Sequence, residues 1–188
     1  MRRERGNDSR APGRFAGADG ATLTLGDGTI VPVRRVGAGD AAALQRLVGR
    51  SSDRSIELRF LGPLKELSDG MARGFAEVDG ENRFALVALD PETPEEIVGV
   101  VRYAREGADD GAEYAALIED RFQGRGLGIR LTKALISVAR ENGIDHLYAL
   151  VMRENVRMLG LLRGLDLPER VRWQDGTERV EIDLQSGN

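Results

Sequence analysis

The chain has 188 residues, of which 41% are hydrophobic, and a formal net charge of −4. This length suits one domain with its own core rather than two. The acidic balance argues against a dedicated nucleic-acid-binding protein, which usually presents a strongly basic face. The chain has no cysteine and one histidine, so we expect no disulfide framework, no thiol nucleophile and no metal site.

The first residues have a different composition from the rest of the chain. Residues 1–20 are rich in Arg and Gly and have few large apolar side chains, which predicts a disordered tail ahead of a domain at 21–188. No apolar segment follows the basic start as in a signal peptide, and no apolar run approaches membrane-spanning length. We therefore expect a cytoplasmic protein with no membrane or nucleic-acid partner.

In the first half of the chain, the patterns alternate between strand and helix. Apolar and polar residues alternate around Asp27-Gly28, which predicts a β-hairpin. Helical spacing follows Asp40 and again follows Ser52, a favourable helix cap, with a break near Pro63. The subsequent strand-like runs are 83–90, 97–106 and 113–120.

The second half reads as helix, strand, helix and a closing strand pair. Apolar residues at helical spacing begin at Leu127, and Gly143 marks the end of that helix. The next elements are a strand at 145–151, a short helix at 155–165 and a strand pair at 170–184. We predict an α/β (α+β) fold with a single mixed, mostly antiparallel sheet and helices on both faces.

Residues 121–130, RFQGRGLGIR, form a glycine-rich loop between a strand and a helix. Such a loop leaves backbone N–H groups uncovered beside the positive end of the helix, which suits a phosphate or pyrophosphate. A Walker loop would need Lys-Ser or Lys-Thr where Ile129-Arg130 stands, and a dinucleotide fingerprint would need a glycine at Ile129. Both alternatives fail at positions that contact the ligand.

The spacing Q-x-x-G-x-G at 123–128 resembles the acetyl-CoA pyrophosphate loop of the GNAT superfamily of N-acetyltransferases. The segment 147–167 resembles the family's next strand and its N-x-x-M-x-x-L motif. Upstream, residues 51–68 resemble the second-helix region of bacterial protein-lysine acetyltransferases. The resemblance spans 28–184 and implies the GNAT fold, with acetyl-CoA as the co-substrate.

The resemblance also implies which residues bind the cofactor. Leu117 and Ile118, on the strand before the loop, would offer backbone groups to the pantetheine arm and the thioester oxygen. Asn155 would cap the following helix and reach the same arm. The loop residues expected to bind acetyl-CoA are Gln123, Gly124, Arg125, Gly126, Leu127 and Gly128. Of the arginines around the loop, only Arg125 is favoured for a phosphate contact, over Arg121 and Arg130.

Glu113 is the candidate general base. A lysine amine has a pKa of about 10.4, so a carboxylate that removes its proton accelerates attack by roughly 10²–10⁴-fold. Glu113 alternates with Ala115 and Leu117 on one strand face, where a charge is out of place. By resemblance, lysine acetyltransferases keep their general base at this position; the alternative is an edge glutamate that reaches water. Glu119 and Asp120 are expected to be turn formers and solvated charges.

The general acid is not evident. Seven residues beyond Asn155, many family members carry a tyrosine that protonates the departing thiolate, but this chain has Leu162. Either water acts instead, or Tyr103, Tyr114 or Tyr148 does, or no acid is used. His146 is expected to be structural. Trp173 is expected to pack on the closing hairpin, and the alternative is that it lines an acceptor groove.

We expect an N-acetyltransferase that works by direct attack in a ternary complex, because no cysteine exists to carry the acetyl group. The expected partners are acetyl-CoA and an amine acceptor, a protein lysine before a small-molecule amine. A second hypothesis is a non-catalytic acetyl-CoA-binding module. A nucleotide enzyme is disfavoured because the loop lacks the motif positions given above.

Overall fold

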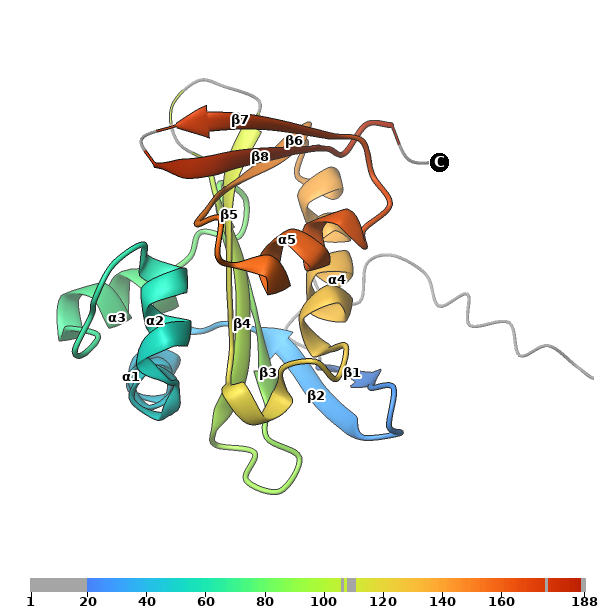
Figure 1. The fold of residues 1–188 in the computed structure, drawn as a ribbon. Coiled ribbons are helices and arrows are strands. Elements are labelled where there is room, and N and C mark those ends of the chain that lie inside the picture. Colours follow the sequence, from blue (N-terminus) through green and yellow to red (C-terminus); the bar gives the residue numbers. More distant parts are fainter. Residues whose placement is uncertain (1–19, 106, 108–110, 175, 187–188) are drawn as a thin grey trace, which may run out of the picture.

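The computed structural model describes residues 20–105, 107, 111–174 and 176–186. They form one eight-stranded sheet in the order β1-β2-β3-β4-β5-β6-β8-β7, with helices on both of its faces (Figure 1). The expected tail, apart from Gly20, lies outside the described residues, and the domain boundary at residue 20 stays a prediction. The mixed, mostly antiparallel sheet is confirmed.

The first five strands form an antiparallel series. They are β1 (Ala21–Thr24), β2 (Ile30–Arg35), β3 (Arg83–Leu89), β4 (Ile97–Ala104) and β5 (Gly111–Ile118). The predicted hairpin between β1 and β2 is present, with Gly28 at φ +87° and the Thr29 amide donating to Asp27 Oδ1 over 3.0 Å. β5 ends earlier than predicted, because the short 3₁₀ turn η2 (Asp120–Phe122) intervenes before the glycine loop.

Three helices precede β3 and cover one face of the sheet. They are α1 (Ala41–Arg50), α2 (Asp53–Phe60) and α3 (Asp69–Ala76), with a 3₁₀ turn, η1 (Ala38–Asp40), before α1. The predicted cap of α2 is confirmed, since the Ser52 hydroxyl accepts a hydrogen bond from the Ser55 amide. α3 was not predicted from the sequence, because Gly70 and Gly74 weaken its helical pattern. Its start was nevertheless marked by Ser68, which caps the Met71 amide.

The second half follows the predicted order. It comprises α4 (Leu127–Glu141), β6 (His146–Val151), α5 (Val156–Arg163), β7 (Glu169–Gln174) and β8 (Thr177–Asp183). β6 runs parallel to β5, and β8 lies between β6 and β7. None of the helices in the described part of the chain is long and apolar enough to cross a membrane. The expected cytoplasmic location stays a prediction.

Each sheet face carries its own hydrophobic cluster. Residues such as Leu86 and Leu135 pack between the sheet and α4, whereas Leu47 and Val87 pack on the side of α1–α3. Leu47 is 1% exposed, and its burial alone stabilises the fold by about 1.5–3 kcal/mol. On β5, Tyr114 belongs to the α4 cluster and Leu117 to the α1–α3 cluster. Alternation along the strand therefore places Glu113 on the α1–α3 face.

Candidate active site

The candidate site begins where two neighbouring strands separate. β5 pairs with β4 as far as Ile118, which lies opposite Gly99. On its other edge, the ladder with β6 stops at Glu113 opposite Tyr148, although β6 continues to Val151. The β5 backbone beyond Glu113 therefore has no strand partner on this edge. An unpaired strand edge can hydrogen-bond an extended ligand that carries amide groups.

Glu113 lies at the last paired position before this separation, half-buried on the α1–α3 face. Two arginines of the same face interact with its charge, Arg59 of α2 and Arg102 of β4. Its neighbour across the ladder is Tyr148. The structure thus brings the predicted base to the mouth of the open strand edge.

The glycine loop leads from η2 into α4. Gly124 and Gly126 have φ values of +72° and +86°, a region that favours glycine. Gly126 is the N-cap of α4 and provides no side-chain cap, so the first N–H groups of this 15-residue helix are left for another acceptor. The loop therefore has the form of an anion cradle.

Gly128 serves a different purpose from the other two glycines. It lies within the first turn of α4, where an added Cβ would sit 3.0 Å from Leu161 Cδ1 and 3.6 Å from Ile118 Cγ1. A side chain at this position would require the Leu161 side chain of α5 to shift by a few tenths of an ångström. Gly128 thus lets α5 approach the start of α4 and the end of β5.

Gln123 joins three elements through its side chain. Its amide nitrogen donates to Ile118 O over 2.8 Å and to Ser55 Oγ over 3.1 Å, and its amide oxygen accepts from Arg157 of α5. The residue therefore fixes the loop to β5, α2 and α5. Cofactor binding by Gln123, Leu117 and Ile118 stays a prediction.

The arginines near the loop differ in what they contact. Arg125 donates from Nε to Asp27 Oδ2 and from its terminal nitrogen to Thr29 Oγ1, both over 2.8 Å. These bonds hold the β1–β2 turn against the loop. The pKa of Asp27 is lowered to about 2, first by hydrogen bonds from Thr29 and then by Arg125. A phosphate contact from Arg125 stays a prediction.

Arg130 was not favoured in the sequence analysis, but its environment suits a phosphate contact. It is exposed on the first turn of α4, and its Nε lies 3.8 Å from where a Cβ of Gly126 would be. Among the described residues it has no ion-pair partner. Only the folded structure shows this, because the sequence does not reveal which arginines find carboxylates.

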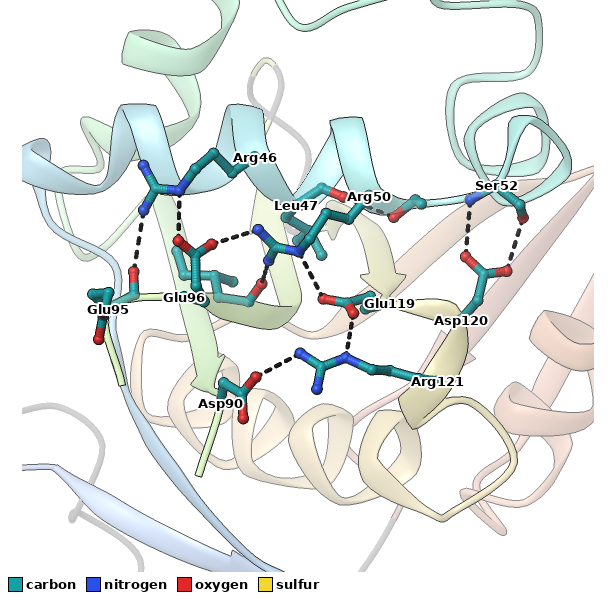
Figure 2. A network of polar contacts seen from close by, with 12 residues as sticks. Arg46, Leu47, Arg50, Ser52, Asp90, Glu95, Glu96, Glu119, Asp120 and Arg121 are labelled. Carbon is teal, nitrogen blue, oxygen red and sulfur yellow. Dashed lines mark hydrogen bonds and ion pairs between the residues drawn. The ribbon is translucent and has the colours of Figure 1, made fainter. Parts of the chain in front are cut away.

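Glu119 is not a solvated charge as expected. It is 5% exposed and accepts hydrogen bonds from Arg50 of α1 and from Arg121 (Figure 2). Arg121 also reaches Asp90, and Arg50 also reaches Glu96, so the network spans α1, the β3–β4 turn and η2. Burial of a carboxylate is tolerated because two guanidiniums satisfy it.

Asp120 is also more than a turn former, although it is exposed. Its carboxylate accepts from the Ser52 amide over 2.9 Å and from Ser52 Oγ over 2.8 Å (Figure 2). It also accepts from Ser55 Oγ over 2.9 Å. Burial raises the pKa of Asp120, but these hydrogen bonds outweigh it and leave the pKa below its usual value. Asp120 thereby clamps the start of α2 to the turn that precedes the glycine loop.

Asn155 caps α5 as predicted, since its Oδ1 accepts from the Met158 amide over 3.1 Å. Leu162, at the position of the family's tyrosine, is 2% exposed and belongs to the α4 cluster. The position therefore contributes to the core in this chain. Contact of Asn155 with a pantetheine arm stays a prediction.

Of the tyrosines considered as acids, Tyr148 alone lies opposite Glu113 on the same sheet face. The Tyr103 hydroxyl donates to Glu81 O over 3.0 Å and accepts from Asn142, and burial raises its pKa. Tyr114 is buried on the α4 face with its hydroxyl 2.7 Å from Thr132 Oγ1, and burial raises its pKa strongly. Tyr148 is half-buried, with the Arg179 guanidinium 3.5 Å from its ring centroid.

His146 and Trp173 are the remaining residues singled out in the sequence, and each contacts a neighbouring residue of the fold. The His146 ring covers Gly111, where an added Cβ would lie 2.2 Å from Nε2. Trp173 is 56% exposed on β7, with the Arg153 guanidinium 4.0 Å from its ring centroid, so it is less packed than expected. Within the described ranges, no cluster of three or more His, Cys, Asp or Glu side chains could hold a metal ion.

Comparison with known proteins gives consistent results. A family model described as the acetyltransferase (GNAT) family matches residues 55–166. An acetyltransferase of Pseudomonas aeruginosa is 34% identical over 143 residues, which cover 76% of this chain and 77% of that protein.

Among solved structures, the GNAT domain of S. lividans PAT superposes with a TM-score of 0.81 at 32% identity, covering 87% of this chain and 96% of that one. A Salmonella typhimurium protein solved with its cofactor acetyl-CoA shares the fold, with a TM-score of 0.65 and 16% identity over 84% of this chain and 95% of that one.

Proposed function

Because the chain belongs to the acetyltransferase (GNAT) family, we propose that it transfers an acetyl group from acetyl-CoA to an amine, in particular a protein lysine. The observation that carries this proposal is the position of Glu113 at the point where β5 and β6 separate. A ligand that binds along the free edge of β5 would lie in the opening between β5 and β6, and Glu113 lies at the start of that opening. The similarity to the GNAT domain of S. lividans PAT supports the choice of a protein acceptor.

We assign the cofactor to the open strand edge and the glycine loop. The backbone of Leu117 and Ile118 binds the pantetheine arm, and Asn155 reaches it from the start of α5. The pyrophosphate lies on the backbone amides at the start of α4, which carry the positive end of the helix dipole. The loop residues that form this cradle are Gln123, Gly124, Arg125, Gly126, Leu127 and Gly128.

Acetyl transfer then requires three contributions from the chain. Glu113 accepts a proton from the acceptor ammonium, and the neutral nitrogen attacks the thioester carbon. A backbone N–H near Leu117 stabilises the oxyanion that forms. When the carbon–sulfur bond breaks, the attacking nitrogen loses its second proton to water and becomes the amide nitrogen. The CoA thiolate leaves and takes a proton from water or from Tyr148, which lies opposite Glu113 on β6. Glu113 then gives its proton back to solvent. No acetyl group is carried by the protein, because the sequence has no cysteine.

The substitution Glu113→Gln tests the proposed role of this residue. It keeps the shape of the side chain but cannot take the proton, so turnover at pH 7 should fall by about 10²-fold or more. Affinity for acetyl-CoA should change by less than about threefold, because Glu113 is not assigned to the cofactor. A higher pH should restore part of the rate, since more of the acceptor is then neutral. CoA release with lysine peptides and small amines measures the rate at each pH, and a calorimetric titration measures the affinity for acetyl-CoA.

Glu57→Gln is the matched control, because Glu57 is a half-exposed α2 glutamate paired with Arg54. It should leave turnover unchanged. Equal rates for wild type and Glu113→Gln across pH 6–9 would refute the assignment of Glu113. A wild-type protein that binds acetyl-CoA but acetylates no amine would instead support the binding-module hypothesis.

A further inference from the structure

Two arginines lie on the same sheet face as Glu113, beneath α1–α3. Arg59 comes from α2 and Arg102 from β4, where Arg102 is opposite Ala115 of β5. They line a cavity of about 20 Å³ whose other walls include Phe60, Phe75 and Leu117. The cavity has room for one small group.

Arg102 has an unsatisfied guanidinium. One of its terminal nitrogens is buried without a hydrogen-bond partner, and the guanidinium carbon lies 4.4 Å from the centroid of the Phe75 ring. Burial lowers the pKa of Arg102, and the charge of Arg83 lowers it further, whereas Glu113 acts in the opposite direction. A buried donor without a partner is costly, and a ligand that accepts from it removes that cost.

Arg59 also lies against aromatic rings of this cavity. Its guanidinium carbon lies 4.8 Å from the centroid of the Phe60 ring and 6.0 Å from that of Phe75. Burial lowers the pKa of Arg59 to about 10, and the neighbouring charge of Arg102 adds to this effect. Neither Arg59 nor Arg102 has a hydrogen bond or ion pair with a carboxylate in the part of the chain that the structure describes.

Several other arginines of this protein have carboxylate partners, in contrast to Arg59 and Arg102. Arg34 binds both oxygens of Asp40 over 2.7 and 2.8 Å, and Arg50 and Arg121 have carboxylate partners in the network of Figure 2. Glu113 is the acidic group that acts on both Arg59 and Arg102, while Arg83 adds a further positive charge near Arg102, so positive charge is in excess here. Half-buried charges of this kind are usually paired.

We propose that Arg59 and Arg102 form a carboxylate-binding subsite beside Glu113. The proposal rests on the acetyl-transfer function argued above and names a feature of its substrate. An arginine guanidinium donates charge-assisted hydrogen bonds to a carboxylate oxygen. The cavity of about 20 Å³ holds about one water-sized group, which is enough for one such oxygen between the aromatic rings. The carboxylate belongs either to the acceptor, as an acidic residue next to the lysine, or to the acyl chain of a dicarboxylic acyl-CoA.

Two kinetic arms separate these sources. The first compares the end-blocked dipeptides Lys-Glu and Lys-Gln as acceptors with acetyl-CoA; the second compares succinyl-CoA with acetyl-CoA on Lys-Gln. We expect kcat/KM to favour the carboxylate by about tenfold or more in one arm, the size of a charge-assisted hydrogen bond. Arg59→Gln and Arg102→Gln should each bring that ratio close to one. Arg54→Gln, an exposed α2 arginine paired with Glu57 over 2.8 Å, should preserve it.

A binding measurement needs no turnover. Glutarate, titrated into the full chain and followed by NMR, should shift the signals of β4 and α2 in wild type and Arg54→Gln, but not in the Arg59 and Arg102 variants. Glutarate binding without acetylation of any amine would support the subsite and refute the function. Turnover without a carboxylate preference in either arm, together with no glutarate shift, would refute the subsite alone.

Stability distinguishes a ligand site from a structural role. If the arginines await a ligand, Arg102→Gln should leave the Tm of the ligand-free protein unchanged or raised, since it removes an unsatisfied charge. A fall of several degrees in Tm, with the carboxylate preference retained, would show that the two arginines serve packing and would overturn the proposal.

Discussion

The arginines that surround the glycine loop are distinguished by their partners rather than by their place in the sequence. Arg121 is shared between Asp90 and Glu119, and Arg125 is bonded to Asp27. A guanidinium engaged in this way must break an existing pair before it can bind a phosphate. Arg130 is exposed beside the start of α4 without such a pair in the described residues, so it can bind at a lower cost.

We therefore expect Arg130→Gln to weaken acetyl-CoA binding by about three- to tenfold, an effect typical of a partly solvated charge pair. The loss should be greater at low salt, because screening weakens such contacts. Isothermal titration calorimetry at two salt concentrations measures both effects. Arg125→Gln is the comparison: a larger loss there than at Arg130 would mean that Arg125 leaves Asp27 to bind the phosphate.

The sequence alone could not rank these arginines. The partner of Arg125 lies 98 residues away in the chain, in a hairpin turn that the sequence predicted for other reasons. The same limitation explains Glu119, whose burial depends on Arg50 from α1. Local patterns located Glu113 and the glycine loop, whereas the charge partners depend on tertiary contacts.

At the scale of helices and strands, polar side chains join α2, which lies on the proposed acceptor side, to the glycine loop and α5, which lie on the proposed cofactor side. Asp120 holds the start of α2, while Gln123 bonds Ser55 of the same helix and Arg157 of α5. α2 also carries Arg59, one of the proposed carboxylate ligands. A disturbance of the loop should therefore be transmitted to the acceptor side through α2.

The acid stability of the protein should depend on the Asp120 clamp. The pKa of Asp120 is below its model-peptide value of 3.8, so its contribution to folding is complete above about pH 4 and is lost as the pH falls through the lowered value. Asp120→Asn should lower the Tm at pH 7 by a few degrees and flatten its fall below pH 4. Thermal melts from pH 2.5 to 7 measure this. An identical pH profile in wild type and variant would show that the Asp120 charge contributes nothing to stability.

Helices and strands were predicted correctly from the sequence where a capping residue or a regular hydrophobic spacing marks them. Ser52 and Asn155 were recognised as caps and do cap α2 and α5. α3 was not predicted because Gly70 and Gly74 lower its helix propensity. The helix forms nevertheless, because the burial of Ala72 and Ala76 against the rest of the fold compensates for the two glycines. The separation of β5 from β6 left no local signature either, since both strands have ordinary apolar patterns.

Considered as a whole, the sheet consists of two parts that meet at a short parallel ladder. β1–β5 form one antiparallel series and β6–β8 another, and the ladder joins Gly111 through Glu113 to His146 through Tyr148 (Figure 1). The α4 cluster bridges both parts with residues such as Leu147 and Leu162. A ligand between β5 and β6 would add hydrogen bonds where the ladder has ended.

Acetyl-CoA binding should therefore slow amide exchange at the junction of the two parts. With free acetyl-CoA at about 100 times its Kd, linkage adds about 2.7 kcal/mol to the native state, so amides that exchange only after release of the ligand should slow by about 100-fold. We expect this protection in peptides that cover 114–118 and 124–130, and little change in α3, which contributes nothing to the proposed cofactor site. Hydrogen–deuterium exchange with mass spectrometry measures this protection.

ATP at the same concentration is the control, because it carries phosphates but no pantetheine arm and should not protect 114–118. Equal protection of β5 by ATP, or protection by acetyl-CoA confined to the β7–β8 hairpin, would place the cofactor elsewhere than in the opening between β5 and β6.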